Sequence, residues 1–323
     1  MRIWVSLFVC VATLAAMPAN SINYDATRPI YDDTAIKRSV DQLPQVLTDA
    51  YAKNKPVLFY VHGRGDEPTK SFSAGMTGGG ALPRLEKEYG VTVVMVNWSS
   101  KGKSRLDRAT PLGKMPEAVA TFDATMSTLA AFRASHPDVA APSLLVHSMG
   151  AIVVAKAIEA HGWRGTAEAP LFQHVLLSEA DADSQGHDVW LSKLAAVERV
   201  YVTQNSDDFV LKHSTDQRSP STNRALGLKP VAPLVARATY VDLTGALKKK
   251  LIVGAHQIFA KAWMGGNVGT CMFVSNVLRG QRFEILALSQ VKLVSGSRYK
   301  IQRDVNKAHQ CFADVDANAG DDE

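Results

Sequence analysis

The chain has 323 residues, of which 46% are apolar and 21% are charged. This balance excludes an intrinsically disordered chain and is typical of a globular protein that buries a sizeable core. The formal net charge of +5 is small, and the basic residues are scattered, with residues 248–250 as a short run. We therefore expect no nucleic-acid partner and no dedicated surface for anionic lipids.

The N-terminal segment MRIWVSLFVCVATLAAMPAN joins one positive charge to an apolar run that ends in small residues near Ala16 and Ala19. This order is typical of a secretory signal peptide. A membrane anchor is the alternative, but the run is shorter than the ~20 residues that span a bilayer, and no basic flank follows it. We predict export to the periplasm or the medium after cleavage of residues 1–19, with no other membrane association.

Export would leave Cys271 and Cys311 in an oxidising compartment, where a disulfide bond between them is expected. Two separately buried thiols are the alternative. The third cysteine, Cys10, lies inside the apolar run of the signal segment, and the residues before it do not resemble a lipoprotein cleavage site.

Continuous apolar runs bounded by turn residues predict buried strands at residues 56–61, 91–96, 144–147, 175–177, 200–203 and 238–243. Helices are predicted between them, most clearly at residues 117–135, where apolar side chains recur three or four residues apart and Pro116 opens the first turn. Strands that alternate with helices indicate a mostly parallel sheet with helices on both faces. Ligands of such sheets bind at the carboxyl ends of the strands, where the loops at residues 63–80 and 99–115 begin.

The expected organisation is a signal peptide at residues 1–19, a polar N-terminal lead at 20–54, the α/β domain at 55–265 and a small β-rich appendage at 266–323. The appendage is predicted from strand-like runs at residues 271–277, 283–294 and 299–305. Its last residues, 321–323, are acidic and are expected to form a frayed end.

The stretch LLVHSMGAIV, residues 144–153, places Ser148 between a strand and a helix. This is the order of a nucleophile elbow, a turn so tight that small residues are needed on either side of the serine. Gly150 meets that need, whereas Val146 occupies the other small position, so the match to G-x-S-x-G is partial. An ordinary helix cap by Ser148 is the alternative.

A serine hydroxyl becomes a good nucleophile only when a base accepts its proton and an acid orients that base. His256 lies in the loop after the last strand of the α/β domain, and we expect it to be the base. His309 belongs to the appendage. His147 is excluded because successive side chains of an extended segment point to opposite faces.

The acid is expected in the loop after residues 200–203, where Asp207 and Asp208 are neighbours. Only one of them can point at the imidazole, and we select Asp207, with Asp208 as the alternative acid or as a solvent-facing or capping residue. Glu179, Asp181 and Asp183 also follow a strand, but we expect them to form a loop of solvated carboxylates.

An oxyanion also needs hydrogen-bond donors. Glycines after the first strong strand let backbone N–H groups face the site, so we expect one donor from Gly63 or Arg64 and a second from Met149. A simple turn at the end of the strand is the alternative. Trp98, Met76 and the loop at residues 99–115 are candidates for an acyl pocket or a lid, or for plain loop packing.

The stretches VLFYVHGRG, VVMVNWSS, LLVHSMGA, VYVTQNSDDFVL and GAHQIF together resemble an alpha/beta hydrolase, most closely a bacterial branch of hydrolases of unknown function. The resemblance covers roughly residues 56–264. It implies that Ser148, Asp207 and His256 are nucleophile, acid and base. The branch usually carries Asn where this chain has Ala151, and Ala also fits the start of a helix.

These features predict an exported serine hydrolase that cleaves a carboxylic ester of a small-molecule or lipid-like substrate through an acyl-enzyme, with a thioester or an amide as alternatives. No metal or organic cofactor is required. Two other classes remain open: a catalytically silent envelope-binding protein on the same fold, and a phospholipase that works at the membrane surface. The substrate and the oligomeric state do not follow from the sequence.

Overall fold

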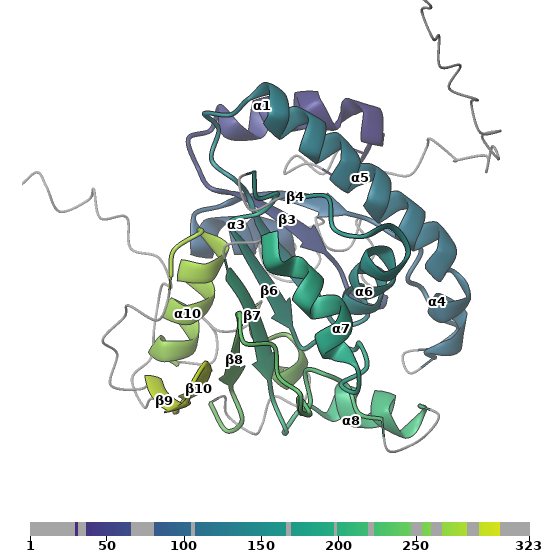
Figure 1. Ribbon diagram of the computed structural model, residues 1–323, viewed down its shortest axis with the longest axis vertical. Coiled ribbons are helices and arrows are strands. Elements are labelled where there is room, and N and C mark those ends of the chain that lie inside the picture. Colours follow the sequence, from purple (N-terminus) through teal and green to yellow (C-terminus); the bar gives the residue numbers. More distant parts are fainter. Residues whose placement is uncertain are drawn as a thin grey trace, which may run out of the picture.

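The computed structural model (Figure 1) describes residues 30–31, 37–65, 81–104, 107–165, 169–196, 199–218, 223–246, 254–259, 267–282 and 291–303. Several predictions fall outside these residues: those for the signal peptide at 1–19, the basic run at 248–250, Met76, His309, Cys311 and the acidic tail.

One sheet of ten strands forms the centre of the described chain, in the order β2-β1-β4-β3-β5-β6-β7-β8-β10-β9. All six runs predicted to be strands belong to it. The bounds are β1 (Ile30–Tyr31), β2 (Lys37–Arg38), β3 (Val57–Val61), β4 (Thr92–Val96), β5 (Ser143–His147), β6 (His174–Ser178), β7 (Arg199–Gln204), β8 (Ala238–Asp242), β9 (Val291–Ser295) and β10 (Arg298–Ile301). β3, β4, β5 and β6 are buried along their whole length, which is why their sequences are apolar without alternation.

The central strands β4, β3, β5, β6, β7 and β8 are parallel to one another, and β10 continues the parallel pairing on β8. β3 pairs with β4 on one side and with β5 on the other, so the chain reverses its direction of travel across the sheet after β4. The carboxyl ends of β3 and β5 therefore flank a topological switch point, where ligands of open parallel sheets bind.

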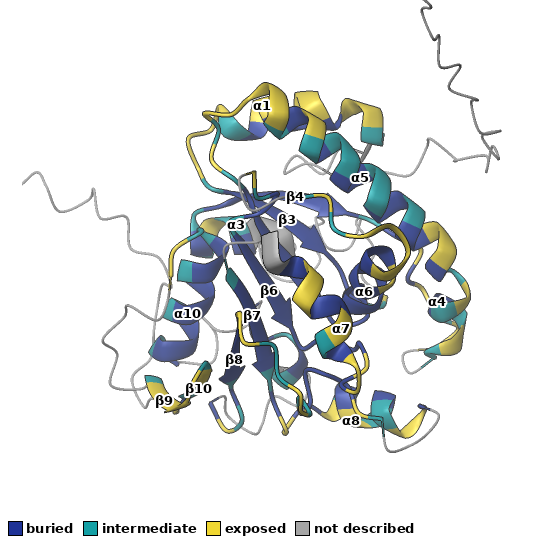
Figure 2. Ribbon diagram, viewed as in Figure 1, coloured by how far each residue is buried: buried dark blue, intermediate teal, exposed yellow. Residues whose placement is uncertain are grey.

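Helices cover both faces of the sheet, as the alternation of elements predicted. They are α1 (Leu43–Tyr51), α3 (Ala81–Tyr89), α4 (Ala109–Gly113), α5 (Met115–Ser135), α6 (Gly150–His161), α7 (His187–Leu191), α8 (Phe209–Asp216) and α10 (Val268–Leu278), with 3-10 turns η1 (Val40–Gln42), η2 (Ser192–Ala196) and η3 (Gly254–His256). α1, α5, α6 and α7 supply the core of one face, and α3 and α10 supply that of the other. Exposed residues gather on the outer sides of these helices, while the strands between them are buried (Figure 2).

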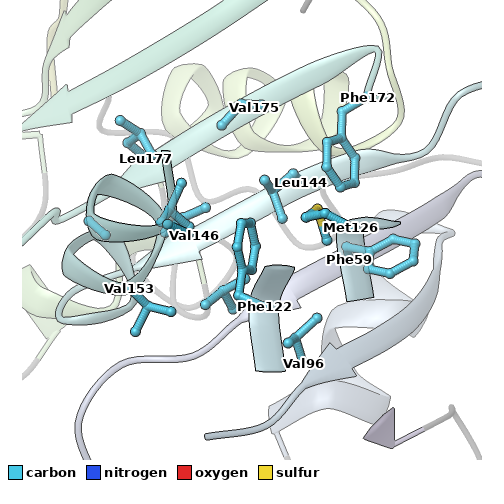
Figure 3. Packing of buried hydrophobic residues seen from close by; sticks show 14 of the residues in the cluster. Phe59, Val96, Phe122, Met126, Leu144, Val146, Val153, Phe172, Val175 and Leu177 are labelled. Atoms are coloured by element: carbon cyan, nitrogen blue, oxygen red, sulfur yellow. The ribbon is translucent and has the colours of Figure 1, made fainter. Parts of the chain in front are cut away.

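Alternate residues of each strand serve the two cores. Phe59 of β3 points to the face of α5 and α6, where its ring meets that of Phe172 edge to face at 5.6 Å. Phe122 and Met126 of α5 pack into the same cluster, beside Val146 of β5 (Figure 3). Leu58 and Tyr60, the neighbours of Phe59 along the strand, belong to the opposite cluster.

The N-terminal lead contributes to this fold. β1 pairs antiparallel with β4, and α1 packs into the same core as α5. Leu43, Val46 and Leu47 of α1 are buried. The described part of the lead is therefore an edge of the sheet and a covering helix.

The prediction of a strand at residues 271–277 is wrong, because this segment is helix α10. Its sequence, VGTCMFVSNVL, is apolar almost throughout, and a run of this kind has no periodicity that separates a buried strand from a buried helix. The distinguishing signals lie at the ends. The side chain of Asn267 caps the helix by accepting the Thr270 N–H at 2.8 Å, and Gly280 follows the helix with a φ of 75°.

Where the structure describes the predicted C-terminal strands, it has β9 and β10, which pair antiparallel and extend the main sheet beyond β8. Residues 283–290 and 304–305 of the predicted runs lie outside the described residues. The structure records Cys271 of α10 as half of a disulfide bond. The pairing with Cys311 stays a prediction, since Cys311 is outside the described residues. Within the described ranges, no helix combines the length and the apolar character that crossing a bilayer requires.

Candidate active site

Ser148 occupies the turn between β5 and α6 and has a φ of 52°, in the left-handed region that non-glycine residues rarely adopt. Backbone hydrogen bonds hold it there. Its N–H donates to the Ser178 carbonyl at 3.1 Å, and its own carbonyl accepts from the Asp181 N–H at 2.9 Å. Its side chain does not cap α6, whose N-cap position is Met149. The strained strand-turn-helix geometry is thus present, and the helix-cap alternative is not.

Two glycines allow this turn to pack against the end of β3. A Cβ atom at Gly150 would lie 2.7 Å from the Val61 carbonyl oxygen, and one at Gly63 would lie 2.8 Å from the Ser148 Cβ. Both distances are too short for any side chain. Val146, which stands where the motif has its other small residue, directs its side chain into the core (Figure 3).

His256, in the turn η3, reaches the serine directly. Its Nε2 lies 3.0 Å from the Ser148 Oγ, and its Nδ1 lies 2.8 Å from the Asp208 Oδ2. A carboxylate only accepts hydrogen bonds, so Nδ1 carries the proton and Nε2 is the acceptor for the hydroxyl. The imidazole and the carboxylate are both buried. Serine, histidine and aspartate therefore form one continuous hydrogen-bonded line.

The selection of Asp207 as the acid is corrected by this geometry, because the carboxylate on His256 belongs to Asp208. The Asp207 carboxylate lies on the outside, where it accepts the Gly245 N–H at 3.1 Å. Asp208 is also the N-cap of α8. Its Oδ1 accepts the Leu211 N–H at 3.0 Å while its Oδ2 meets His256. Capping and orienting the imidazole are thus done by the two oxygens of one side chain.

His147 contacts the turn that carries His256. Its Nε2 donates to the His256 carbonyl at 2.8 Å, and its ring lies 5.0 Å from the His256 ring and 4.9 Å from that of Phe259. It therefore supports the backbone of the turn that carries His256. Sequence reasoning missed this role, because it depends on a contact between residues 109 positions apart.

Glu179 contradicts the expected loop of solvated carboxylates, because it is 1% exposed. It has a φ of 47°, and its Oε2 accepts the Ser178 hydroxyl at 2.6 Å. Burial raises the pKa of this carboxyl to about 7, against the lowering effect of His147, and the nearby Asp208 carboxylate raises it further. Asp181 is also buried, and only Asp183 has an exposed side chain.

The candidate oxyanion donors surround Ser148. The backbone N–H groups of Gly63, Arg64 and Met149 donate to no acceptor among the residues that the structure describes. Met149 directly follows the serine, and the Gly63 backbone approaches its Cβ as described above.

Trp98 supports the loop that carries Gly63. Its indole N–H donates to the His62 carbonyl at 2.8 Å, its backbone N–H donates to the His62 Nε2 at 3.1 Å, and the two rings stack at 5.6 Å. It is buried, so its part is loop packing. The loop at residues 99–115, in contrast, supplies Arg108 and Leu112 to the wall of a cavity.

The described residues hold no group of three or more His, Cys, Asp or Glu side chains arranged to bind a metal ion. The chemistry available from these residues is that of a hydroxyl nucleophile, a neutral imidazole base, a buried carboxylate and free backbone donors.

Comparison with known proteins shows the family to which the chain belongs. Residues 39–228 match the family model described as an alpha/beta hydrolase of unknown function (DUF900). No curated protein matches the chain. Among solved structures, the chain is similar to the phospholipase PlaB from Legionella pneumophila, solved in complex with thio-NAD, at 13% identity and a TM-score of 0.26. That match covers 58% of this chain and 37% of the phospholipase.

Proposed function

Since this chain belongs to the family of alpha/beta hydrolases of unknown function, which its residues 39–228 match, we propose that it is a serine hydrolase that cleaves a carboxylic ester. Ser148 is the nucleophile, His256 the general base and Asp208 the orienting acid. The observation that carries the proposal is the line of hydrogen bonds in which His256 lies 3.0 Å from the Ser148 Oγ and 2.8 Å from the Asp208 Oδ2.

The reaction begins when the Ser148 Oγ bonds to the ester carbonyl carbon and its proton passes to the His256 Nε2. The carbonyl electron pair moves onto the oxygen, where the N–H groups of Met149 and of Gly63 or Arg64 stabilise the charge. The imidazolium that forms is stabilised by Asp208. Each lost oxyanion donor is expected to cost roughly 10²–10³ in kcat.

The tetrahedral intermediate collapses when the alkoxide leaves with the proton held by His256, which yields the alcohol and an acyl group on Ser148. His256 then removes a proton from a water molecule, and the hydroxide bonds to the acyl carbon. Expulsion of Ser148, which recovers its proton from His256, releases the carboxylic acid. Thioesters and amides follow the same sequence with a thiol or an amine as the leaving group, so they stay within the proposal.

Covalent labelling tests the nucleophile. We expect a fluorophosphonate probe to label the protein and the label to be absent from Ser148→Ala. Ser206→Ala is the matched control, because Ser206 is an exposed residue of the loop that also carries Asp208. Equal labelling of wild type and Ser148→Ala would refute the assignment. Absence of both labelling and ester turnover would favour a catalytically silent binding protein.

Export is part of the proposal. The disulfide bond at Cys271 supports an oxidising compartment. We expect the chain recovered from the periplasm or the medium to begin at residue 20, which N-terminal sequencing would read. Full-length chain retained in the cell would contradict this.

A further inference from the structure

A cavity of about 320 Å³ lies beside the first turns of α6, on the side of the loop that follows β6. One part of its wall is apolar and includes Ile152, Ala155 and Trp190. The other part carries the side chains of Arg108, Lys156 and Arg218. The wall is thus mainly polar, with a smaller apolar part, and such a surface suits a small molecule that carries a charged group.

Arg218 is held rigidly in this wall. Its side chain is 2% exposed, and its Nη2 donates to the Asp181 Oδ1 at 2.6 Å, while its Nη1 pairs with Asp183. Its Nη2 also donates to the Asp181 carbonyl at 2.6 Å, whereas its Nε is buried and has no hydrogen-bond partner among the described residues. The Nε atom is covered by other protein atoms, so Arg218 contributes its charge to the cavity through a fixed position in the wall.

Arg108 shares the same carboxylate from the other side. Its Nε lies 3.4 Å from the Asp181 Oδ2, and its side chain is 15% exposed. In the described part of the chain, its terminal nitrogens donate to no acceptor. Lys156, which is exposed on α6, has no carboxylate within salt-bridge distance in the same described ranges.

The acidic groups of the cavity are less available than the basic ones. Asp183, one of the two carboxylates in the wall, is already engaged by Arg218, and Glu159, the other, is exposed, so water screens its charge. Asp181, behind the wall, is engaged by both arginines. Arg64 adds a further positive charge within electrostatic range of Asp181. Within the described ranges, the cationic donors in the wall that bind no carboxylate are therefore the terminal nitrogens of Arg108 and the ammonium group of Lys156.

Two relationships connect the wall of the cavity to the turn that carries Ser148. Asp181, which both arginines contact, donates its backbone N–H to the Ser148 carbonyl at 2.9 Å. Ile152 in the cavity wall lies four residues beyond Ser148 on α6, which is roughly 6 Å along the helix axis at the usual rise per residue. The cavity wall at Ile152 thus begins about one helical turn from Ser148.

We propose that this cavity is a subsite for an oxyanion, a carboxylate or a phosphate, carried by the substrate of the proposed serine hydrolase. Arg108 donates to the oxyanion, Arg218 and Lys156 add their positive charges, and the apolar side chains of the wall pack against the carbon chain between the oxyanion and the scissile ester. The inference rests on the proposed function, because it takes Ser148 as the reacting group.

Binding to Ser148→Ala by calorimetry tests the subsite without turnover. The probes are hexanoate for the carboxylate, phenyl phosphate for the phosphate, and hexanamide as the neutral match of hexanoate. We expect at least one anion to bind about tenfold or more tightly than hexanamide, and Arg108→Gln to weaken that binding roughly tenfold. Lys156→Gln, at an exposed position, provides a second variant that tests the charge without touching the buried network.

Lys87→Gln is the matched control, since Lys87 is exposed on α3, on the opposite face of the sheet. Binding of hexanoate alone assigns a carboxylate, and binding of phenyl phosphate alone assigns a phosphate. Either result supports the subsite. Anions that bind no more tightly than hexanamide, or binding that both pocket variants leave unchanged, would overturn it, as would equal weakening by Lys87→Gln.

Turnover gives a second readout. The 4-nitrophenyl monoesters of succinic, glutaric, adipic and pimelic acid are compared with neutral esters of equal chain length. We expect one acid ester to have the higher kcat/KM, and Arg108→Gln to reduce that preference roughly tenfold. If fluorophosphonate labels Ser148 but no acid ester is preferred, the subsite is wrong and the hydrolase proposal stands. If Ser148 is not labelled, the hydrolase proposal fails, and calorimetry still decides whether the cavity binds anions.

Discussion

The Nδ1 atom of His256 lies 2.8 Å from the Oδ2 of Asp208, although Asp207, the preceding residue, also carries a carboxylate. The Asp207 side chain instead accepts the Gly245 N–H at 3.1 Å on the outside of the same loop. Asp208 turns inward because it begins helix α8, whose Leu211 N–H it accepts. The start of one helix thus decides which of two neighbouring carboxylates orients the imidazole.

Asparagine substitutions at these two positions form a matched pair. We expect Asp208→Asn to lower kcat/KM by roughly 10⁴, because the amide no longer favours the tautomer in which Nδ1 donates and no longer stabilises the imidazolium. The melting temperature should change little from the loss of the cap, since Asn caps helices about as well as Asp. Asp207→Asn should leave kcat/KM within about threefold, as is usual for exposed positions. Equal effects of the two variants on ester turnover would contradict the assignment of Asp208.

Glu179→Gln tests the buried carboxyl beside the site. Burial raises its pKa from 4.5 to about 7, so the folded protein holds this proton more tightly than the unfolded chain. The corresponding stability is fully present below pH 4.5 and is lost as the pH rises through about 7. The loss at pH 8 is on the order of 3 kcal/mol of unfolding free energy.

Urea unfolding of wild type and Glu179→Gln between pH 4.5 and pH 8 measures this effect. A neutral amide has no proton to lose, so the stability of the variant relative to wild type should rise across this range. Glu159→Gln, which changes an exposed carboxyl, is the control and should follow the wild-type curve. Parallel curves for wild type and Glu179→Gln would show that Glu179 does not titrate in this range.

The central strands and the order of Ser148, acid and His256 were predictable from the sequence. Strands buried on both faces are continuous apolar runs, and polar residues that follow such runs must meet at one edge of a parallel sheet. The choice between Asp207 and Asp208 was not predictable in this way. Both residues follow the same strand, so their positions in the sequence do not show which side chain points toward His256. The start of helix α8 at Phe209 turns Asp208 inward.

Other features of the structure depend on contacts between distant residues, and local sequence patterns do not encode such contacts. Helix α10 is apolar on most of its surface, so the spacing of its apolar residues does not reveal the helical periodicity. Glu179 is buried by its surroundings, whereas its sequence context is that of an acidic loop. Arg108 and Arg218 come together only because both contact Asp181.

Gly150→Ala probes the contact between the turn at Ser148 and β3. The added Cβ would lie 2.7 Å from the Val61 carbonyl oxygen and 2.8 Å from that of His62, and backbone atoms cannot move aside as a flexible side chain would. We expect a loss of about 1–3 kcal/mol of unfolding free energy, together with lower ester turnover, because the serine shifts relative to His256.

Gly113→Ala is the control for this substitution. Gly113 ends α4, and a Cβ there would meet no atom within 4 Å. Alanine should be neutral at this position or should add about 0.5–1 kcal/mol through its higher helix propensity. Thermal or urea unfolding of the two variants gives the comparison. A stable and fully active Gly150→Ala would show that the turn has more room than these distances indicate.

Cys271 lies in the core of the sheet face that α10 covers, and its disulfide bond fixes this helix to another part of the chain. Because Cys10 is expected to leave with the signal peptide, we predict that Cys311 is its partner in the mature protein. Peptide mapping under non-reducing conditions should give a linked pair that contains both residues.

Dithiothreitol should lower the free energy of unfolding of the wild type by about 2–4 kcal/mol. Cys311→Ala should show the same loss, and reduction should then have no further effect, because the cross-link is already absent. Cys311→Ala that keeps both the wild-type stability and its sensitivity to reduction would assign the partner of Cys271 elsewhere.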